Sequence, residues 1–98
     1  MNIESRYNAS TRALVIGVTG DFSFSLVDEF RAAYRHLDPL SVQIDLSQAQ
    51  RIDSSALGML LNMRKTLGKK TVIKITNSSP YVRRILSIAN FDSKFDIR

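Results

Sequence analysis

Residues 41–61, SVQIDLSQAQRIDSSALGMLL, contain the change of sequence period that decides the fold. Apolar and polar residues alternate from Val42 to Leu46, which predicts a strand with one covered face. Leucines then recur at helical spacing from Leu57 to Leu61. The chain therefore passes from a strand into a helix within this stretch, and we expect that helix to begin at residue 54 and end near residue 67.

The junction between that strand and that helix is rich in capping side chains. Asp53, Ser54 and Ser55 are residue types preferred at a helix N-terminus. The free N–H groups and the dipole of a helix start both favour an anion there. A phosphate on Ser54 or Ser55 would add about two negative charges to the surface without unravelling the helix. Ordinary capping is the alternative explanation of these two serines.

The same residues carry a resemblance to a known family. Residues 45–47 read Asp-Leu-Ser and residues 52–58 read Ile-Asp-Ser-Ser-Ala-Leu-Gly, which resembles the signature of STAS domains, the fold of anti-sigma-factor antagonists. In that family the serine after the aspartate is phosphorylated. By position this serine is Ser54, and Ser55 is the second choice. Ala56 replaces the usual glycine, and because alanine is the better helix former the first turn is still expected to form.

The resemblance implies a switchable binding module. The unphosphorylated form of such a protein binds an anti-sigma factor, often a serine kinase, and thereby frees a sigma factor. The kinase phosphorylates the serine and loses affinity, and a serine phosphatase of the PP2C type resets the module. ATP belongs to the kinase. The alternative is a STAS subunit of a lipid-transport ABC complex, which would contact its ATPase subunit constitutively.

Catalytic chemistry is poorly supported by the residues themselves. The chain has no cysteine and one histidine, His36, and no nucleophile stands at a recognisable spacing from a base. We therefore expect no catalytic residue, no cofactor and no metal site. The net charge is +5, and no Asp or Glu occurs from Ser54 to Phe91. Solvated helix faces explain this, and without an aromatic platform beside the charges direct nucleic-acid binding is not expected.

The residues expected to contact a partner lie at two turns and along the start of the second helix. Gly20, Asp21 and Phe22 follow the family pattern at a first turn, whereas Ser23 replaces an acid there. Helical spacing places Met59 on an exposed face, opposite the leucines. The full expected set is Asp21, Ser23, Asp53, Ser55, Ala56, Met59 and Asn62. Loop and capping chemistry is the alternative for Asp21 and Ser23, and packing under a neighbouring loop is the alternative for Met59.

The composition indicates one folded domain spanning residues 1–98. Hydrophobic residues make up 44% of the 98 residues, which is typical of a globule rather than a disordered chain. The N-terminus lacks the apolar core of a signal peptide, and no stretch approaches the length of a membrane span. We therefore expect a cytoplasmic protein that does not insert into a membrane. Its oligomeric state is left open.

The order of elements predicts an α/β fold. A central, mostly parallel sheet of four to five strands should be covered by about three to four helices. Ser25 is expected to cap the first helix, and serine followed by Pro80 to start the third. Strands are expected at residues 3–7, 13–18, 42–46, 71–76 and 95–97.

Overall fold

The computed structural model describes residues 2–98. Its elements are β1 (Ile3–Asn8), β2 (Ala13–Phe22), the 3-10 turn η1 (Phe24–Leu26), α1 (Val27–Ala32), β3 (Ser41–Ile52), α2 (Ser54–Leu67), β4 (Val72–Thr76), α3 (Pro80–Ile88), the 3-10 turn η2 (Phe91–Ser93) and β5 (Asp96–Ile97). Within residues 2–98, none of the helices is both long and apolar enough to cross a membrane.

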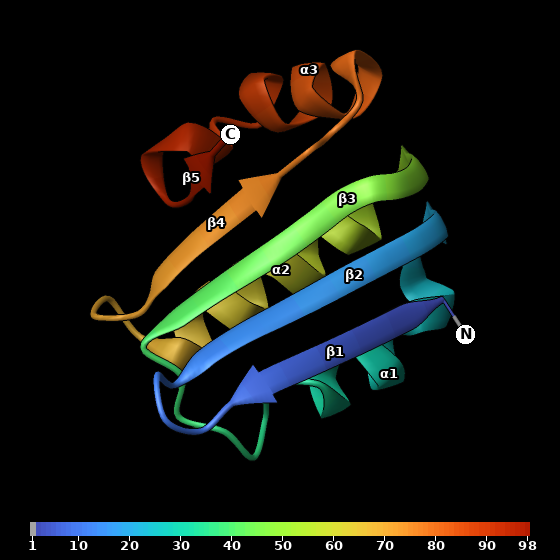
Figure 1. The fold of residues 1–98 in the computed structure, drawn as a ribbon. Helices are drawn as coiled ribbons and strands as arrows, with labels where there is room; N and C mark the ends of the chain where they lie inside the picture. Colours follow the sequence, from blue (N-terminus) through green and yellow to red (C-terminus); the bar gives the residue numbers. More distant parts are fainter. Residues whose placement is uncertain (1) are drawn as a thin grey trace.

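The five strands form one sheet in the order of the sequence (Figure 1). β1 is antiparallel to β2, and the other neighbours are parallel. The parallel pairs are joined by helical crossovers, as parallel strands require. Figure 1 shows α1 and α2 behind the sheet and α3 beyond β4. The prediction of a mostly parallel α/β sheet with three helices is confirmed.

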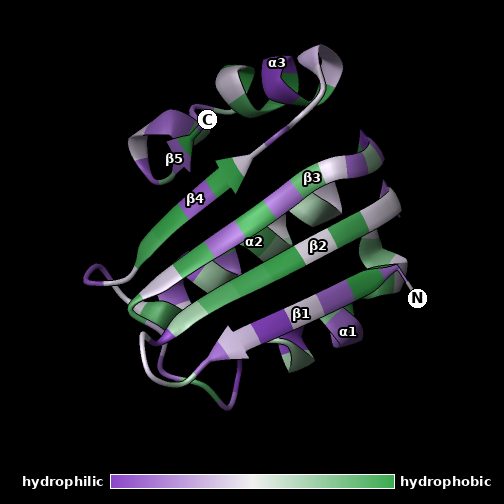
Figure 2. Cartoon of the chain, in the orientation of Figure 1, coloured by the Kyte–Doolittle hydropathy of each residue, from purple (hydrophilic) through white to green (hydrophobic). Residues whose placement is uncertain are grey.

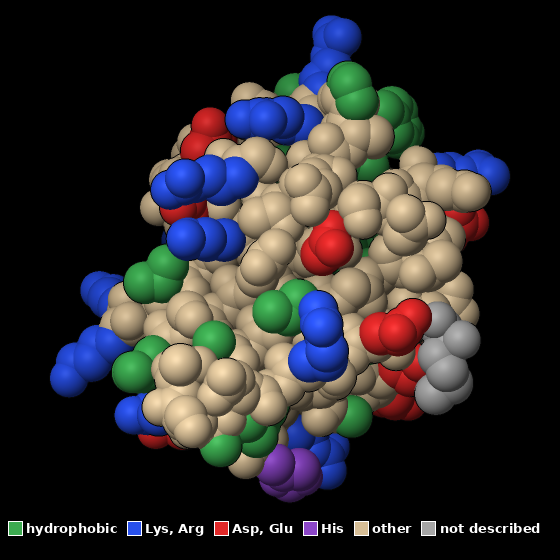
Figure 3. All heavy atoms as spheres, in the orientation of Figure 1, with side chains coloured by type: hydrophobic (Ala, Val, Ile, Leu, Met, Phe, Trp, Pro, Cys, Tyr) green, Lys and Arg blue, Asp and Glu red, His purple; other side chains and the backbone are tan. Residues whose placement is uncertain are grey.

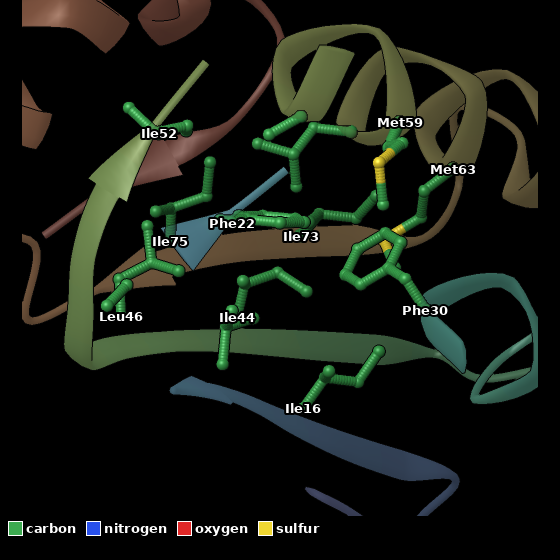
Figure 4. Packing of buried hydrophobic residues seen from close by; sticks show 14 of the residues in the cluster. Ile16, Phe22, Phe30, Ile44, Leu46, Ile52, Met59, Met63, Ile73 and Ile75 are labelled. Atoms are coloured by element: carbon green, nitrogen blue, oxygen red, sulfur yellow. The ribbon is translucent and has the colours of Figure 1, made fainter. Parts of the chain in front are cut away.

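The core lies between the sheet and the helices behind it. Val42, Ile44 and Leu46 of β3 are all at most 1% exposed, and Figure 2 shows hydrophobic and polar residues alternating along this strand. Figure 4 shows Ile44 of the sheet and Met63 of α2 in the same buried cluster, with the ring of Phe30 beside Met63. The opposite face of the sheet, turned toward the viewer in Figure 3, carries scattered charged side chains on a mostly polar surface. The helices therefore bury one face of the sheet, and the alternation of side chains along strands such as β3 leaves the less buried, more polar residues on the other face.

The two central strands are longer than the sequence pattern predicts. β2 continues to Phe22 and β3 to Ile52, so residues 47–52 are strand rather than turn. The extra residues pair with each other, with register shifts between Gly17 and Thr19 and between Gly20 and Asp21. These irregularities keep the backbone groups paired where the alternation of side chains breaks down.

The first helix is shorter than expected and begins differently. α1 starts at Val27 after the 3-10 turn, and neither helix start has a side-chain cap. The prediction that Ser25 caps a helix is therefore wrong, and its hydroxyl lies 3.0 Å from that of Ser23. An aromatic cluster fixes the segment instead: the ring of Phe30 lies 5.2 Å from that of Phe22 and 5.8 Å from that of Tyr34.

The face of α2 that packs on the sheet differs from the predicted face. Met59 is only 8% exposed and Leu61 is 38% exposed, so the interpretation of Met59 as a surface residue and of Leu61 as a core residue is wrong. The buried stripe consists of Ala56, Met59, Leu60 and Met63. This stripe has helical spacing, but two methionines and an alanine occupy it, so the leucine pattern alone does not reveal it.

The far end of α2 is held by Arg64. Its guanidinium donates to the main-chain carbonyls of Gly68 at 2.6 Å, Lys94 at 3.2 Å and Thr71. Partial burial lowers the pKa of Arg64. The side chain therefore ties the end of α2 to the segment before β4 and to the C-terminal turn, which keeps the helix fixed on the sheet.

The faces of α2 can be tested by truncating two adjacent leucines. Leu60 is fully buried, so Leu60→Ala is expected to lower the free energy of unfolding by about 2–5 kcal/mol. Leu61→Ala, on the exposed side, is the matched control and is expected to cost less than about 1 kcal/mol. Urea denaturation followed by circular dichroism measures both. Equal losses for the two variants would show that the helix is rotated from the position described.

Candidate functional site

The candidate site lies where β2 and β3 end side by side. Phe22 pairs with Ile52 in the parallel register, and the backbone N–H of Asp53 donates to the carbonyl of Phe22 at 3.4 Å. After this point one strand leads into η1 and the other into α2. In open α/β sheets the carboxyl ends of parallel strands are where binding residues gather, because the loops there diverge. The two turns named by the sequence motif therefore meet at one edge.

Asp53 fixes the first turn of α2. Its Oδ1 accepts hydrogen bonds from Ser55 Oγ at 2.6 Å and from the backbone N–H of Ala56 at 3.0 Å. These bonds, that from Ser55 first, lower the pKa of Asp53 from its ordinary value of 3.8. The carboxylate is therefore ionised at neutral pH and satisfies one of the free N–H groups of the helix start.

The two candidate serines differ in what their hydroxyls do. Ser55 is half-buried, and its hydroxyl is engaged with Asp53. Ser54 is the first residue of α2 and is exposed, and within residues 2–98 its hydroxyl has no hydrogen-bond partner. Modification of Ser54 would therefore leave the cap intact, whereas modification of Ser55 would break a hydrogen bond that supports it.

A shallow hollow adjoins this turn. It is lined by Asp21, Phe22, Ser23, Arg51, Ile52, Asp53 and Tyr81. Arg51 Nε lies 3.5 Å from Asp21 Oδ1, and both side chains are largely exposed, so this ion pair contributes little to stability. Tyr81, near the start of α3, is 60% exposed. Arg51 and Tyr81 were not among the expected contact residues. Arg51 lies in the part of β3 that was not predicted, and Tyr81 reaches this edge only because α3 begins beside it.

The structure places the expected contact residues at two separate surfaces, except for Ala56, which is buried. Asp21, Ser23 and Asp53 line the hollow, whereas Ser55, Met59 and Asn62 line a separate groove between α1 and α2. Ala56 is fully buried beneath the turn, so its side chain is not available to a partner and that interpretation is wrong. Ala56 acts through its backbone N–H, which is bonded to Asp53.

The Asp-Leu-Ser part of the motif has a structural role. Asp45 Oδ1 accepts from the backbone N–H of Ser47 at 3.0 Å and from Asn77 Nδ2 at 3.2 Å. The first of these bonds is the main cause that lowers the pKa of Asp45. The carboxylate thus ties β3 to the residue that follows β4, away from the serines. No three His, Asp or Glu side chains within residues 2–98 gather in a group that could hold a metal ion.

Comparison with known proteins assigns the family. Residues 5–97 match the family model described as "Mlab, STAS domain". The chain belongs to the STAS domain family. A STAS-domain containing protein of Pseudomonas aeruginosa (strain UCBPP-PA14) is 40% identical over 100 residues, an alignment that covers 99% of each chain. The family predicted from the motif around Ser54 is confirmed.

Solved structures share the STAS fold at low sequence identity. An anti-sigma factor antagonist from Mycobacterium paratuberculosis superposes with a TM-score of 0.79 and 23% identity, covering 97% of this chain and 84% of that one. The Bacillus cell fate determinant SpoIIAA in its phosphorylated form superposes with a TM-score of 0.73 and 16% identity, covering 98% and 90%. At these identities the likeness shows the fold of this STAS domain.

The cap can be tested by removing the Asp53 carboxylate. Asp53→Ala should lower the free energy of unfolding by about 1 kcal/mol at pH 7. Because folding lowers the pKa of Asp53, its contribution is present above pH 3.8 and is lost as pH falls through the lower folded value. Urea unfolding of both proteins at pH 7 and pH 3 should therefore show a smaller difference at pH 3. A difference that is unchanged or larger at pH 3 would contradict the role of the ionised carboxylate.

Proposed function

We propose that this STAS protein is an anti-sigma-factor antagonist switched by phosphorylation of Ser54. The observation that carries the proposal is an exposed, unbonded hydroxyl at the first position of a helix whose cap is already satisfied by Asp53. Structural neighbours of this fold include an anti-sigma factor antagonist and a cell fate determinant in its phosphorylated form. They support the proposal through shared fold.

In the proposed cycle, the unphosphorylated protein binds an anti-sigma factor that has serine kinase activity. Within the complex, Ser54 Oγ attacks the γ-phosphorus of ATP held by the kinase, ADP leaves, and a base on the kinase takes the hydroxyl proton. The phosphoprotein dissociates. A PP2C-type phosphatase then hydrolyses the ester to serine and inorganic phosphate. The protein itself is a binding module of the cytoplasm rather than an enzyme, and it contacts no nucleic acid.

Electrostatics explain how the phosphate acts. The hollow beside Ser54 already has two acidic side chains, Asp21 and Asp53, and one basic side chain, Arg51. A phosphate on Ser54 would add about two more negative charges next to it. In the free protein the helix start stabilises such an anion by roughly 0.3–1 kcal/mol, so α2 should stay folded. Within a protein contact the same charge must lose its water, and an uncompensated buried charge costs several kcal/mol. Phosphorylation therefore opposes binding and leaves the fold unchanged.

The modified residue is the first prediction of this proposal. Incubation with the partner kinase and ATP is expected to add one phosphate, and Ser54→Ala is expected to abolish labelling in intact-mass and peptide mass spectrometry. Ser55→Ala is the matched control. It removes the neighbouring hydroxyl and should still be labelled. Labelling that survives in Ser54→Ala and disappears in Ser55→Ala would move the site by one residue.

A charge mimic tests the effect on binding. Ser54→Asp places one negative charge at the helix start, so its melting temperature and circular dichroism should stay close to wild type. Calorimetry should nevertheless show at least tenfold weaker binding to the anti-sigma partner, a loss of about 1.4 kcal/mol. Ser54→Ala should bind like wild type. Equal binding of both variants to the anti-sigma partner would remove the phosphorylation switch and leave a constitutive binding module.

A further inference from the structure

Gly58 occupies a position in α2 that the free protein does not require to be glycine. It lies in the interior of a helix that spans Ser54–Leu67 and has no positive φ. A Cβ built on Gly58 would meet no atom of another element of residues 2–98 within 4 Å. Glycine is a much poorer helix former than alanine, so at this place it weakens α2 without relieving any crowding. The free protein therefore offers no packing reason for glycine here, whereas close approach of a partner to the helix backbone would be one.

The surface beside Gly58 is an open apolar groove between α1 and α2. Phe24, Val27, Phe30, Arg31, Tyr34, Ser55, Gly58, Met59 and Asn62 line it. Phe24 stands at its edge and is 67% exposed, an unusual position for a large aromatic side chain. Met59 and Phe30, which Figure 4 shows close together, are buried at its base. An apolar side chain of a partner would therefore find both a floor and a wall here.

The charge of the groove indicates what else the partner carries. Arg31 is its only charged residue, and among residues 2–98 it forms no ion pair with an acid. None of the residues that line the groove in the described part of the chain is Asp or Glu. A basic rim around an apolar floor is complementary to a segment that has an acidic residue next to an apolar anchor.

The groove reaches the turn at the start of α2 that carries Ser54 and Ser55. Ser55 lines the groove and also donates its hydroxyl hydrogen bond to Asp53, and Ser54 is its neighbour in the chain. A kinase that reaches Ser54 must present its active site at this turn. Its footprint therefore extends naturally onto Gly58, one helical turn away.

We propose that the groove between α1 and α2 receives a segment of the anti-sigma partner whose backbone crosses α2 directly over Gly58. An apolar side chain of that segment packs between Phe24 and Met59, and an acidic residue pairs with Arg31. The absence of a Cβ lets the two backbones approach more closely than any other residue would allow. This inference rests on the proposed function and adds the docking mode.

Substitution of the glycine should move stability and binding in opposite directions. Gly58→Ala is expected to raise the melting temperature by about 4 °C, because alanine favours the helix. The same variant should bind the anti-sigma partner at least tenfold more weakly by calorimetry. Thr66→Ala is the matched control, because Thr66 is exposed on α2 and lies outside the groove. It should stabilise the helix and leave the affinity unchanged.

A charge reversal tests the pairing with Arg31, and two results separate the docking mode from the proposed function. Arg31→Glu reverses the charge of the rim and should weaken binding at least tenfold, with a matched Arg84→Glu on α3 having little effect. If Gly58→Ala binds like wild type, the docking mode is wrong while the proposed function stands. If the wild-type protein does not bind a serine-kinase anti-sigma factor at all, the proposed function itself fails.

Discussion

The hydrogen bond from the backbone N–H of Ala56 to the Asp53 carboxylate, 3.0 Å long, is the interaction on which the functional edge depends. It marks the residue at which β3 ends and α2 begins. Because the same carboxylate oxygen also holds the Ser55 hydroxyl, the turn has one serine committed to structure and one left free. The exposure of Ser54 thus follows from the way the helix is capped.

The fold supplies a rigid base for this edge. β2 and β3 are paired to their last residues, and the fully buried Leu60 and Met63 hold α2 against them. A charge added at Ser54 is therefore expected to change the surface and to leave the packing of the core unaltered. The hollow beside Tyr81 and the groove beside Phe24 flank the turn, so a partner that covers Ser54 has apolar contacts available on both sides. In such a switch, modification would change the affinity for the partner and leave the stability of the fold unchanged.

Local sequence patterns predicted the turn well, since strand alternation, capping residues and helical spacing all act over a few residues. The N-cap at Asp53 and the start of α2 at Ser54 lie where these patterns place them. The extension of β3 to Ile52 was missed, because it depends on pairing with a distant strand. The exposure of Leu61 and the burial of Met59 were not predicted, because the leucine pattern does not show that methionines of α2 pack against the sheet. Phe24 lines the groove and Tyr81 lines the hollow, and these places depend on elements that are distant in the sequence.

The most direct test of the proposed switch at Ser54 is a calorimetric titration of the anti-sigma partner with authentic Ser54-phosphorylated protein and with the same preparation after phosphatase treatment. We predict that the phosphoprotein binds at least tenfold more weakly, that dephosphorylation restores the affinity, and that the two forms melt at similar temperatures. Equal affinities would contradict it. A phosphoprotein that unfolds at a much lower temperature would also contradict it, because the loss of binding would then come from the fold.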